Sequence, residues 1–157
     1  MQNFHPLFVH FPIALLMAAW VLTLLGILAR REGLHRAAMW NLVLGAIGAA
    51  IAAWTGLQGS ATAKPHNFEI HALMELHEHL GLSVAWGTAA LILWRALRRR
   101  AWPAHRAEQV GQTAFLTLLI SLMLYGASLG GRMVYEHGVG INPGVMQSMH
   151  VDGPAAM

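Results

Sequence analysis

The sequence predicts an all-α integral membrane protein in which four transmembrane helices form an up-down-up-down bundle with both termini in the periplasm. The first observation is composition: the 157 residues are 56% hydrophobic and only 11% charged, with a mean hydropathy of +0.49. Such a chain is too apolar for an ordinary soluble domain. The second is that four apolar stretches reach the roughly 20 residues needed to cross a hydrocarbon core. The third is that positive charges gather in two of the connections between these stretches.

The four predicted helices follow the apolar stretches, within a single membrane domain that covers residues 1–157. Their ranges are 5–29, 34–57, 70–94 and 108–130, followed by a periplasmic tail at 131–157. The first stretch has no positively charged segment before it and no small-residue cleavage site after it, so we expect it to remain as a helix and not to act as a secretory signal. Short connections favour antiparallel neighbours.

The first helix begins with "HPLFVHFPIALL", which places two histidines and two prolines in its first turns. Pro6 fits the first helical turn, where a missing N–H is no loss. Pro12 interrupts one backbone hydrogen bond and allows the first turns to bend. A bend there would aim His5 and His10 inward.

The second and fourth helices carry small residues four apart, a spacing that lets helix backbones approach closely in membranes. We expect these faces to pack against neighbouring helices. Their members are Gly45, Ala49 and Ala53, then Gly48, Ala52 and Gly56, and in the fourth helix Gly126 and Gly130.

The positive charges orient the bundle. Eight of the ten Lys and Arg residues lie in the connections after the first and third helices, which the positive-inside rule assigns to the cytoplasm. The sequence pI of about 10.2 is therefore a topology signal and does not indicate a nucleic-acid partner. His35 and His105 lie among these arginines and are expected to be solvated.

The outer side is rich in histidine, with eight of the ten histidines at or near it. At about 100° per residue, four ionisable side chains at the start of the third helix share one face. They are His71, Glu75, Glu78 and His79. His77 points away from this face and is expected to be an interfacial residue. Ionisable residues in membrane segments are costly and usually functional.

Residue counts to the cytoplasmic arginines, with a common helical rise, place polar side chains of three helices at similar depths. We expect them to converge near the outer boundary of the bundle. They are His5, His10, Gln58, His71, Glu75 and His79.

Several ligands would suit such a site. Two imidazoles from different helices can bind a b-type haem, and mixed His and Glu groups suit Fe, Mn, Zn or Cu. The tail motif "MQSMH" offers a weaker copper site. The chain has no cysteine, which excludes disulfides, thiolate metal sites and covalent haem attachment. A transporter is disfavoured because the cytoplasmic halves of the helices carry only neutral polar residues.

The opening motif at residues 5–16, the four membrane segments and "GGRMVYEHGVG" at 130–140 closely resemble an uncharacterised bacterial membrane family, domain of unknown function 2231, over nearly the whole chain. The resemblance implies an inner-membrane protein, and relatives joined to or encoded beside cytochrome-like domains imply haem and electron transfer. It carries over His5 and His10 from the opening motif and His137 with Gly138 from the closing one. Glycines in the closing motif permit the tail to fold back, which would make His137 a ligand or a cap.

We therefore expect a haem b-binding electron-transfer protein with its cofactor near the periplasmic face, acting as a carrier or redox subunit and not as a stand-alone enzyme. His10 and His79 are the expected iron ligands. Substitutes, or ligands of a second haem, are His5, His71 and His137, and the expected supporting residues are Gln58, Glu75 and Glu78. The alternatives are a non-haem metal protein and a cofactor-free subunit of a larger complex. The partners considered are the lipid bilayer, a periplasmic cytochrome or quinone, and a second copy of the chain.

Overall fold

The computed structural model describes residues 5–62, 68–97 and 106–140, and its regular secondary structure is entirely α-helical. The four helices are α1 (His5–Ala29), α2 (Glu32–Thr62), α3 (Phe68–Leu97) and α4 (Arg106–Tyr135). Each is long and apolar enough to cross a membrane. The last three extend beyond the apolar stretches seen in the sequence, because polar residues continue the helix at their ends.

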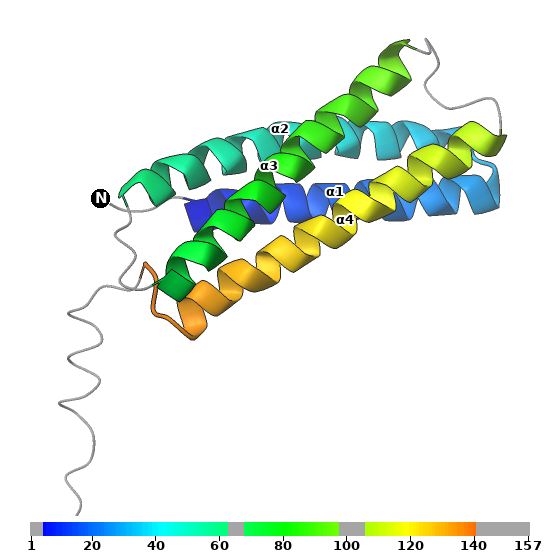
Figure 1. The fold of residues 1–157 in the computed structure, drawn as a ribbon. Helices are drawn as coiled ribbons and strands as arrows, with labels where there is room; N and C mark the ends of the chain where they lie inside the picture. Colours follow the sequence, from blue (N-terminus) through cyan, green and yellow to red (C-terminus); the bar gives the residue numbers. More distant parts are fainter. Residues whose placement is uncertain (1–4, 63–67, 98–105, 141–157) are drawn as a thin grey trace, which may run out of the picture.

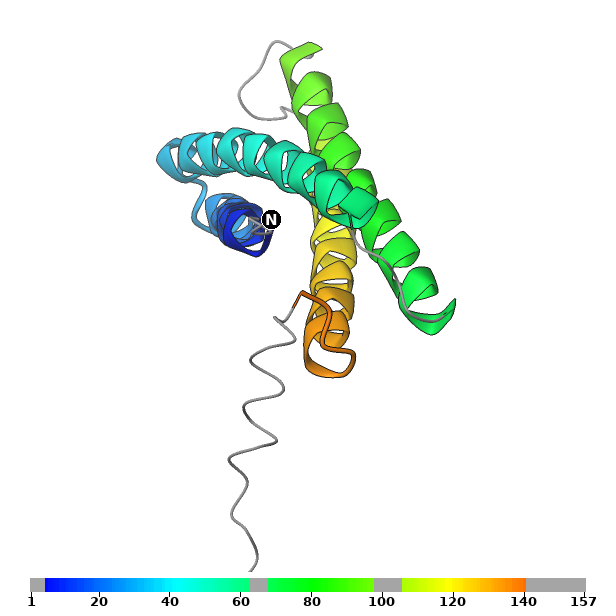
Figure 2. The same cartoon turned by 90° about the vertical axis from the view of Figure 1, so that its left-hand side faces the viewer.

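The helices form two antiparallel pairs that cross each other at an angle (Figures 1 and 2). α1 packs mainly on α2, and α3 mainly on α4. Contacts of α2 with α3 and of α1 with α4 complete a four-helix bundle, while α1 and α3 lie on a diagonal without close backbone contact between their described residues. The start of α1, the end of α2, the start of α3 and the end of α4 lie at the same end of the bundle, which we call the His5 end (Figure 1).

The buried residues of α1, and those of α3 from Val84 onward, are alternately three and four residues apart, the spacing of helices that pack at shallow angles. In α1 the buried residues are Pro12, Leu16, Ala19, Thr23 and Gly26. In α3 they are Ile70, Val84, Thr88, Leu91 and Arg95. The apolar core that these stripes form consists of Leu16, Ala19, Leu42, Val84, Leu91, Leu116, Ile120 and Met123.

Glycines bring α2 close to α1, as the small-residue pattern predicts. A Cβ added at Gly45 would lie 2.7 Å from Cδ2 of Leu16, and one at Gly48 would lie 3.2 Å from Cδ of Pro12. Pro12 therefore sits in a continuous helix at a point where the partner helix has no side chain. Small residues at these positions allow the close packing that stabilises helix pairs in a bilayer.

The outward faces of the bundle are apolar and aromatic, as expected for surfaces that contact lipid. Large exposed side chains occur on every helix, and tryptophans are among them. Examples are Phe11, Trp40, Trp54, Trp86 and Leu118. A soluble bundle would cover these outward faces with polar side chains, so the apolar exterior suits the helices to a bilayer.

The closing motif forms the end of α4. The N–H of Gly138 donates to the carbonyl of Val134 at 3.1 Å, and the N–H of Val139 donates to the carbonyl of Met133 at 2.9 Å. Gly138 has a φ of 64°. This is an αL cap, in which a residue of positive φ, usually glycine, satisfies the last helical carbonyls. The reversal thus occurs at Gly138, because α4 continues through Gly130 and Gly131.

Candidate functional site

Two histidines from diagonally opposed helices meet at the His5 end of the bundle. The rings of His5 on α1 and His77 on α3 have centroids 6.0 Å apart and planes at 85°. Both side chains are half-buried. The first turns of α1 thus aim His5 inward, but they leave His10 exposed.

Hydrogen bonds from the neighbouring helices orient both rings. Nδ1 of His77 donates to the carbonyl of Gly126 on α4 at 2.8 Å. Nδ1 of His5 lies 3.3 Å from Oγ1 of Thr55 on α2. The hydroxyl of Thr55 donates its single proton to the carbonyl of Ala52 at 3.0 Å, so it accepts from Nδ1 of His5. Nδ1 of His77 therefore carries a proton, because a carbonyl only accepts, and the contact with Thr55 places a proton on Nδ1 of His5 as well.

Glycines provide the space that the two rings occupy. A Cβ at Gly56 on α2 would lie 3.1 Å from Cε1 of His5, and one at Gly130 on α4 would lie 3.2 Å from Cε1 of His77. Each imidazole is thus seated against a backbone that lacks a side chain. All four helices contribute to this layer: imidazoles from α1 and α3, glycines and hydrogen-bond acceptors from α2 and α4.

Sequence reasoning missed His77 as a member of the site, although a signal was present. His77 follows Ile70 by seven residues and precedes Val84 by seven, and both of these are buried. Likewise, the three-and-four spacing of the buried residues of α1, continued towards its start, reaches His5. Histidines in register with a buried stripe point into a bundle, whereas the ionisable face chosen from the sequence lies beside that stripe.

His10 and His79, the ligand pair expected from the sequence, are both exposed. Nδ1 of His10 donates to the carbonyl of Pro6 at 2.7 Å, and Nδ1 of His79 donates to the carbonyl of Glu75 at 2.7 Å. Each imidazole is thus held on the surface of its own helix. Their helices α1 and α3 are the diagonal pair, so the structure does not bring these two side chains together.

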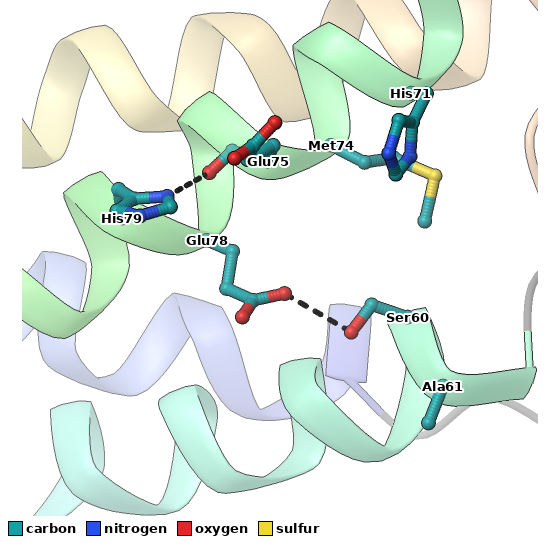
Figure 3. Close-up of a pocket in the computed structure, with 7 residues that line it drawn as sticks. All are labelled: Ser60, Ala61, His71, Met74, Glu75, Glu78 and His79. Atoms are coloured by element: carbon teal, nitrogen blue, oxygen red, sulfur yellow. Dashed lines mark hydrogen bonds between the residues drawn. The ribbon is translucent and has the colours of Figure 1, made fainter.

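The other members of the predicted face surround a hollow between the end of α2 and the start of α3 (Figure 3). The hollow has a volume of about 450 Å³. Its lining residues are Ser60, Ala61, His71, Met74, Glu75, Glu78 and His79. Oε2 of Glu78 accepts a hydrogen bond from Oγ of Ser60 at 3.1 Å, which links the two helices. Gln58 lies exposed on the last turns of α2 and is not part of the lining.

His137 lies next to the cap of α4 and is half-buried. Its Nε2 atom is buried and has no hydrogen-bond partner among the described residues. The chain that follows Gly140, with the Met and His residues of the copper motif, lies outside the described residues, as do His66 and His105.

A second polar layer lies near the opposite end of the bundle and corrects the sequence analysis. His35 was expected to be solvated but is buried, with its ring directly against Gly26. Arg95, counted as a residue of a cytoplasmic connection, lies inside α3 and is 2% exposed. Its Nε donates to Oε1 of Gln112 at 2.9 Å, and Gln112 is 1% exposed. Arg95 is enclosed because α3 extends past its apolar stretch, whereas His35 and Gln112 lie within the predicted second and fourth helices and face the interior.

In the described part of the chain, no three His, Asp or Glu side chains converge tightly enough to hold a metal ion. The His5–His77 layer is therefore a two-ligand arrangement. It presents two imidazoles whose Nδ1 atoms are fixed by hydrogen bonds, which is how metal-ligating histidines are commonly oriented.

Comparison with known proteins identifies the family. A family model described as predicted membrane protein (DUF2231) matches residues 1–143, a range that includes all four helices and the cap of α4. No curated protein and no solved structure matches the chain. Because the match covers most of its length, the chain belongs to the DUF2231 family of predicted membrane proteins.

Proposed function

We propose that this protein binds a b-type haem between His5 and His77 and transfers electrons near one face of a bacterial inner membrane. The observation that carries the proposal is the pair of imidazoles from α1 and α3, with ring centroids 6.0 Å apart. His5 was among the ligands expected from the sequence. His77 takes the place of His10 and His79 in this proposal.

The separation of the rings suits two ligands of one metal. Imidazole nitrogens bind transition metals at about 2.0–2.1 Å, so two nitrogens on opposite sides of one ion lie roughly 4 Å apart. The centre of each ring lies about 1 Å behind its nitrogen, which places the two ring centres roughly 6 Å apart. The observed 6.0 Å agrees with this value.

The number of ligands favours haem over a bare ion. A protein-bound Zn²⁺ ion usually takes three or four side chains, whereas haem iron needs only one or two axial ligands. Within residues 5–62, 68–97 and 106–140 the bundle offers the two imidazoles and no third metal-binding side chain close by. A non-covalent haem is also the form compatible with a chain that has no cysteine.

The residues around the pair would hold and orient the cofactor. When bound, haem supplies one-electron redox chemistry whose potential depends on the axial ligands and their hydrogen bonds. Thr55 and the carbonyl of Gly126 fix the protonated nitrogen of each imidazole. Such contacts raise ligand basicity and prevent the rings from turning away. Gly56 and Gly130 provide the space in which the two rings lie.

The charge distribution supports a periplasmic position for the site. Arg30 and Arg31 lie between α1 and α2, at the end of the bundle opposite to His5. If this end is cytoplasmic, as the positive-inside rule predicts, the His5 end and both termini face the periplasm. Electrons would then pass between a quinone or another membrane donor and a periplasmic cytochrome.

An absorption spectrum of the detergent-purified protein, oxidised and dithionite-reduced, tests the proposal, with metal analysis on the same sample. We expect a Soret band that sharpens and shifts on reduction, and about one iron per chain. A featureless spectrum after expression with ample haem would overturn the proposal. In that case bound Zn, Cu, Fe or Mn would indicate the non-haem alternative.

Four variants then test the ligands. His5→Ala and His77→Ala are expected to abolish the low-spin spectrum, because each removes one axial imidazole. His10→Ala and His79→Ala serve as matched controls and should leave it unchanged. If His10→Ala and His79→Ala abolished the spectrum while His5→Ala and His77→Ala left it unchanged, His10 and His79 would be the iron ligands. The assignment of the ligands to His5 and His77 would then be refuted.

A further inference from the structure

The outward face of α4 differs from the outward face of α2. On α2, exposed positions that are alternately four and three residues apart carry only large apolar side chains, namely Trp40, Leu44, Ile47, Ile51 and Trp54. On α4, exposed positions with the same spacing alternate between small and large residues. They are Ala114, Leu118, Ser121, Tyr125 and Ser128, which we call the α4 stripe. Large apolar residues suit lipid, whereas small and hydroxyl-bearing residues are typical of contacts between membrane helices.

The α4 stripe places hydroxyl groups in the middle of the apolar part of the bundle. Ser121 is exposed and lies halfway along α4 between Gln112, the partner of Arg95, and Gly130, which seats His77. The side chain of Tyr125 is 53% exposed, and its hydroxyl makes no hydrogen bond within the described residues. Because the Cβ atoms of a helix tilt towards its N-terminus, Tyr125 leans towards Ser121 and away from the nearer end of the helix. A hydroxyl at this depth has no water to bond, so a partner within the membrane would stabilise it.

We propose that the α4 stripe is the interface of a homodimer, in which α4 packs in parallel against α4 of a second copy of the chain. This interface does not depend on the proposed haem site. The seven-residue repeat is the spacing of helices that pack side by side at about 20°. A twofold axis along the membrane normal brings each residue of the stripe to its own counterpart. Serines then meet serines, and the two backbones can approach closely.

Tyr125 fits this arrangement because it lies between two small positions. In a parallel pair of helices, a large residue of one helix inserts between residues of the other that lie just above and below it. For Tyr125 these are Ser121 and Ser128 of the second copy. Their hydroxyl oxygens can accept the hydrogen bond of the phenol, which the single chain leaves without an acceptor among its described residues.

Charges at the outer end of the stripe favour a second copy of the same chain over an unrelated helix. Arg132 continues the stripe four residues beyond Ser128, and its Nε donates to Oε2 of Glu136 at 3.1 Å. Both side chains are about half exposed, at 48% and 52%. Two copies side by side bring two guanidinium groups and two carboxylates together, so each Arg132 can also pair with Glu136 of the second copy. The stripe is therefore complementary to itself in charge as well as in shape, as a twofold interface requires.

Cysteine cross-linking tests the interface, because the chain has no cysteine and an introduced thiol is therefore unique. Ser121→Cys and Ser128→Cys, each in the full chain, are oxidised with copper phenanthroline in membranes of the expressing cells. We expect both to form a disulfide-linked dimer of twice the mass of the chain. Ile47→Cys and Ala90→Cys are matched controls, since both positions are exposed near the middle of α2 and α3, and they should not cross-link.

A second measurement fills the small positions without using a thiol. Ser121→Leu should raise the dissociation constant of the dimer at least tenfold, measured by analytical ultracentrifugation in density-matched micelles. Ala90→Leu adds apolar bulk at an exposed position outside the stripe and should leave the constant within twofold. Circular dichroism confirms that both variants are folded.

Three results would overturn the proposal. Equal cross-linking at all four cysteine positions would indicate random collision in the membrane. A disulfide to a protein of different mass would assign the α4 stripe to another partner. A monomer in both measurements would mean that lipid covers the stripe.

Discussion

Replacing Gly45 by alanine is expected to push α1 away from α2. The new Cβ would lie 2.7 Å from Cδ2 and 2.9 Å from Cγ of Leu16, and 3.3 Å from the backbone nitrogen of Leu16. Leu16 is fully buried and belongs to the apolar core, so its side chain cannot turn away without displacing other core residues. Overpacking of this kind costs about 1–3 kcal/mol. We expect the free energy of unfolding to fall by this amount.

Gly81→Ala is the matched control, because Gly81 lies within α3 and a Cβ there would meet no atom within 4 Å. Alanine at an unhindered helical position stabilises by about 0.5–1 kcal/mol relative to glycine. Both variants are measured by reversible unfolding in mixed detergent micelles. We expect the unfolding free energies of Gly45→Ala and Gly81→Ala to differ by roughly 1.5–4 kcal/mol. Equal stabilities would refute the close contact between α1 and α2.

Three further changes test the polar layers and the helix end. Gln112→Leu removes the acceptor of the Arg95 Nε–H and should lower the unfolding free energy by about 1.5–3 kcal/mol. Gln112→Glu keeps an acceptor, so its unfolding free energy should fall by less. Equal decreases in the two variants would argue against this hydrogen bond. Thr55→Val removes the hydroxyl that orients His5, and haem affinity measured by titration should fall about tenfold to hundredfold; unchanged affinity would mean that the hydroxyl does not position the ring. Gly138→Ala places a Cβ at a φ of 64° and should cost about 1 kcal/mol, seen as a lower melting temperature; a neutral result would contradict the cap.

The sequence predicts the number of membrane helices well because hydropathy and length report directly on the solvent. Four apolar stretches of sufficient length correspond to four helices that are long and apolar enough to span a bilayer. Helix ends are less predictable. Arg95 is polar, yet it continues α3 inside the bundle, where its Nε donates to Gln112 of α4. Hydropathy scores each residue without its partner, and it therefore ended the third helix at residue 94, one residue before Arg95.

The candidate site depends on helix rotation, which the polar residues of one helix do not determine by themselves. The face with His71, Glu75 and His79 groups ionisable residues correctly, but such a face can point to water at the membrane boundary as well as to the core. The apolar residues decide the rotation, since those that contact other helices repeat every seven positions. His77 shares that repeat with Val84. A search that aligns ionisable residues with the buried stripe would have found it.

The two polar layers divide the bundle into chemically distinct thirds. His77 and Arg95 are separated by 18 residues of α3, or about 27 Å at about 1.5 Å per residue, close to the roughly 30 Å of a hydrocarbon core. Between them the interior is mainly apolar. The hydroxyl of Thr88 is bonded to its own helix through the carbonyl of Val84. A continuous route for ions or protons would need polar groups throughout this interval. The arrangement therefore fits chemistry confined to one face, with Arg95 and Gln112 anchoring the other.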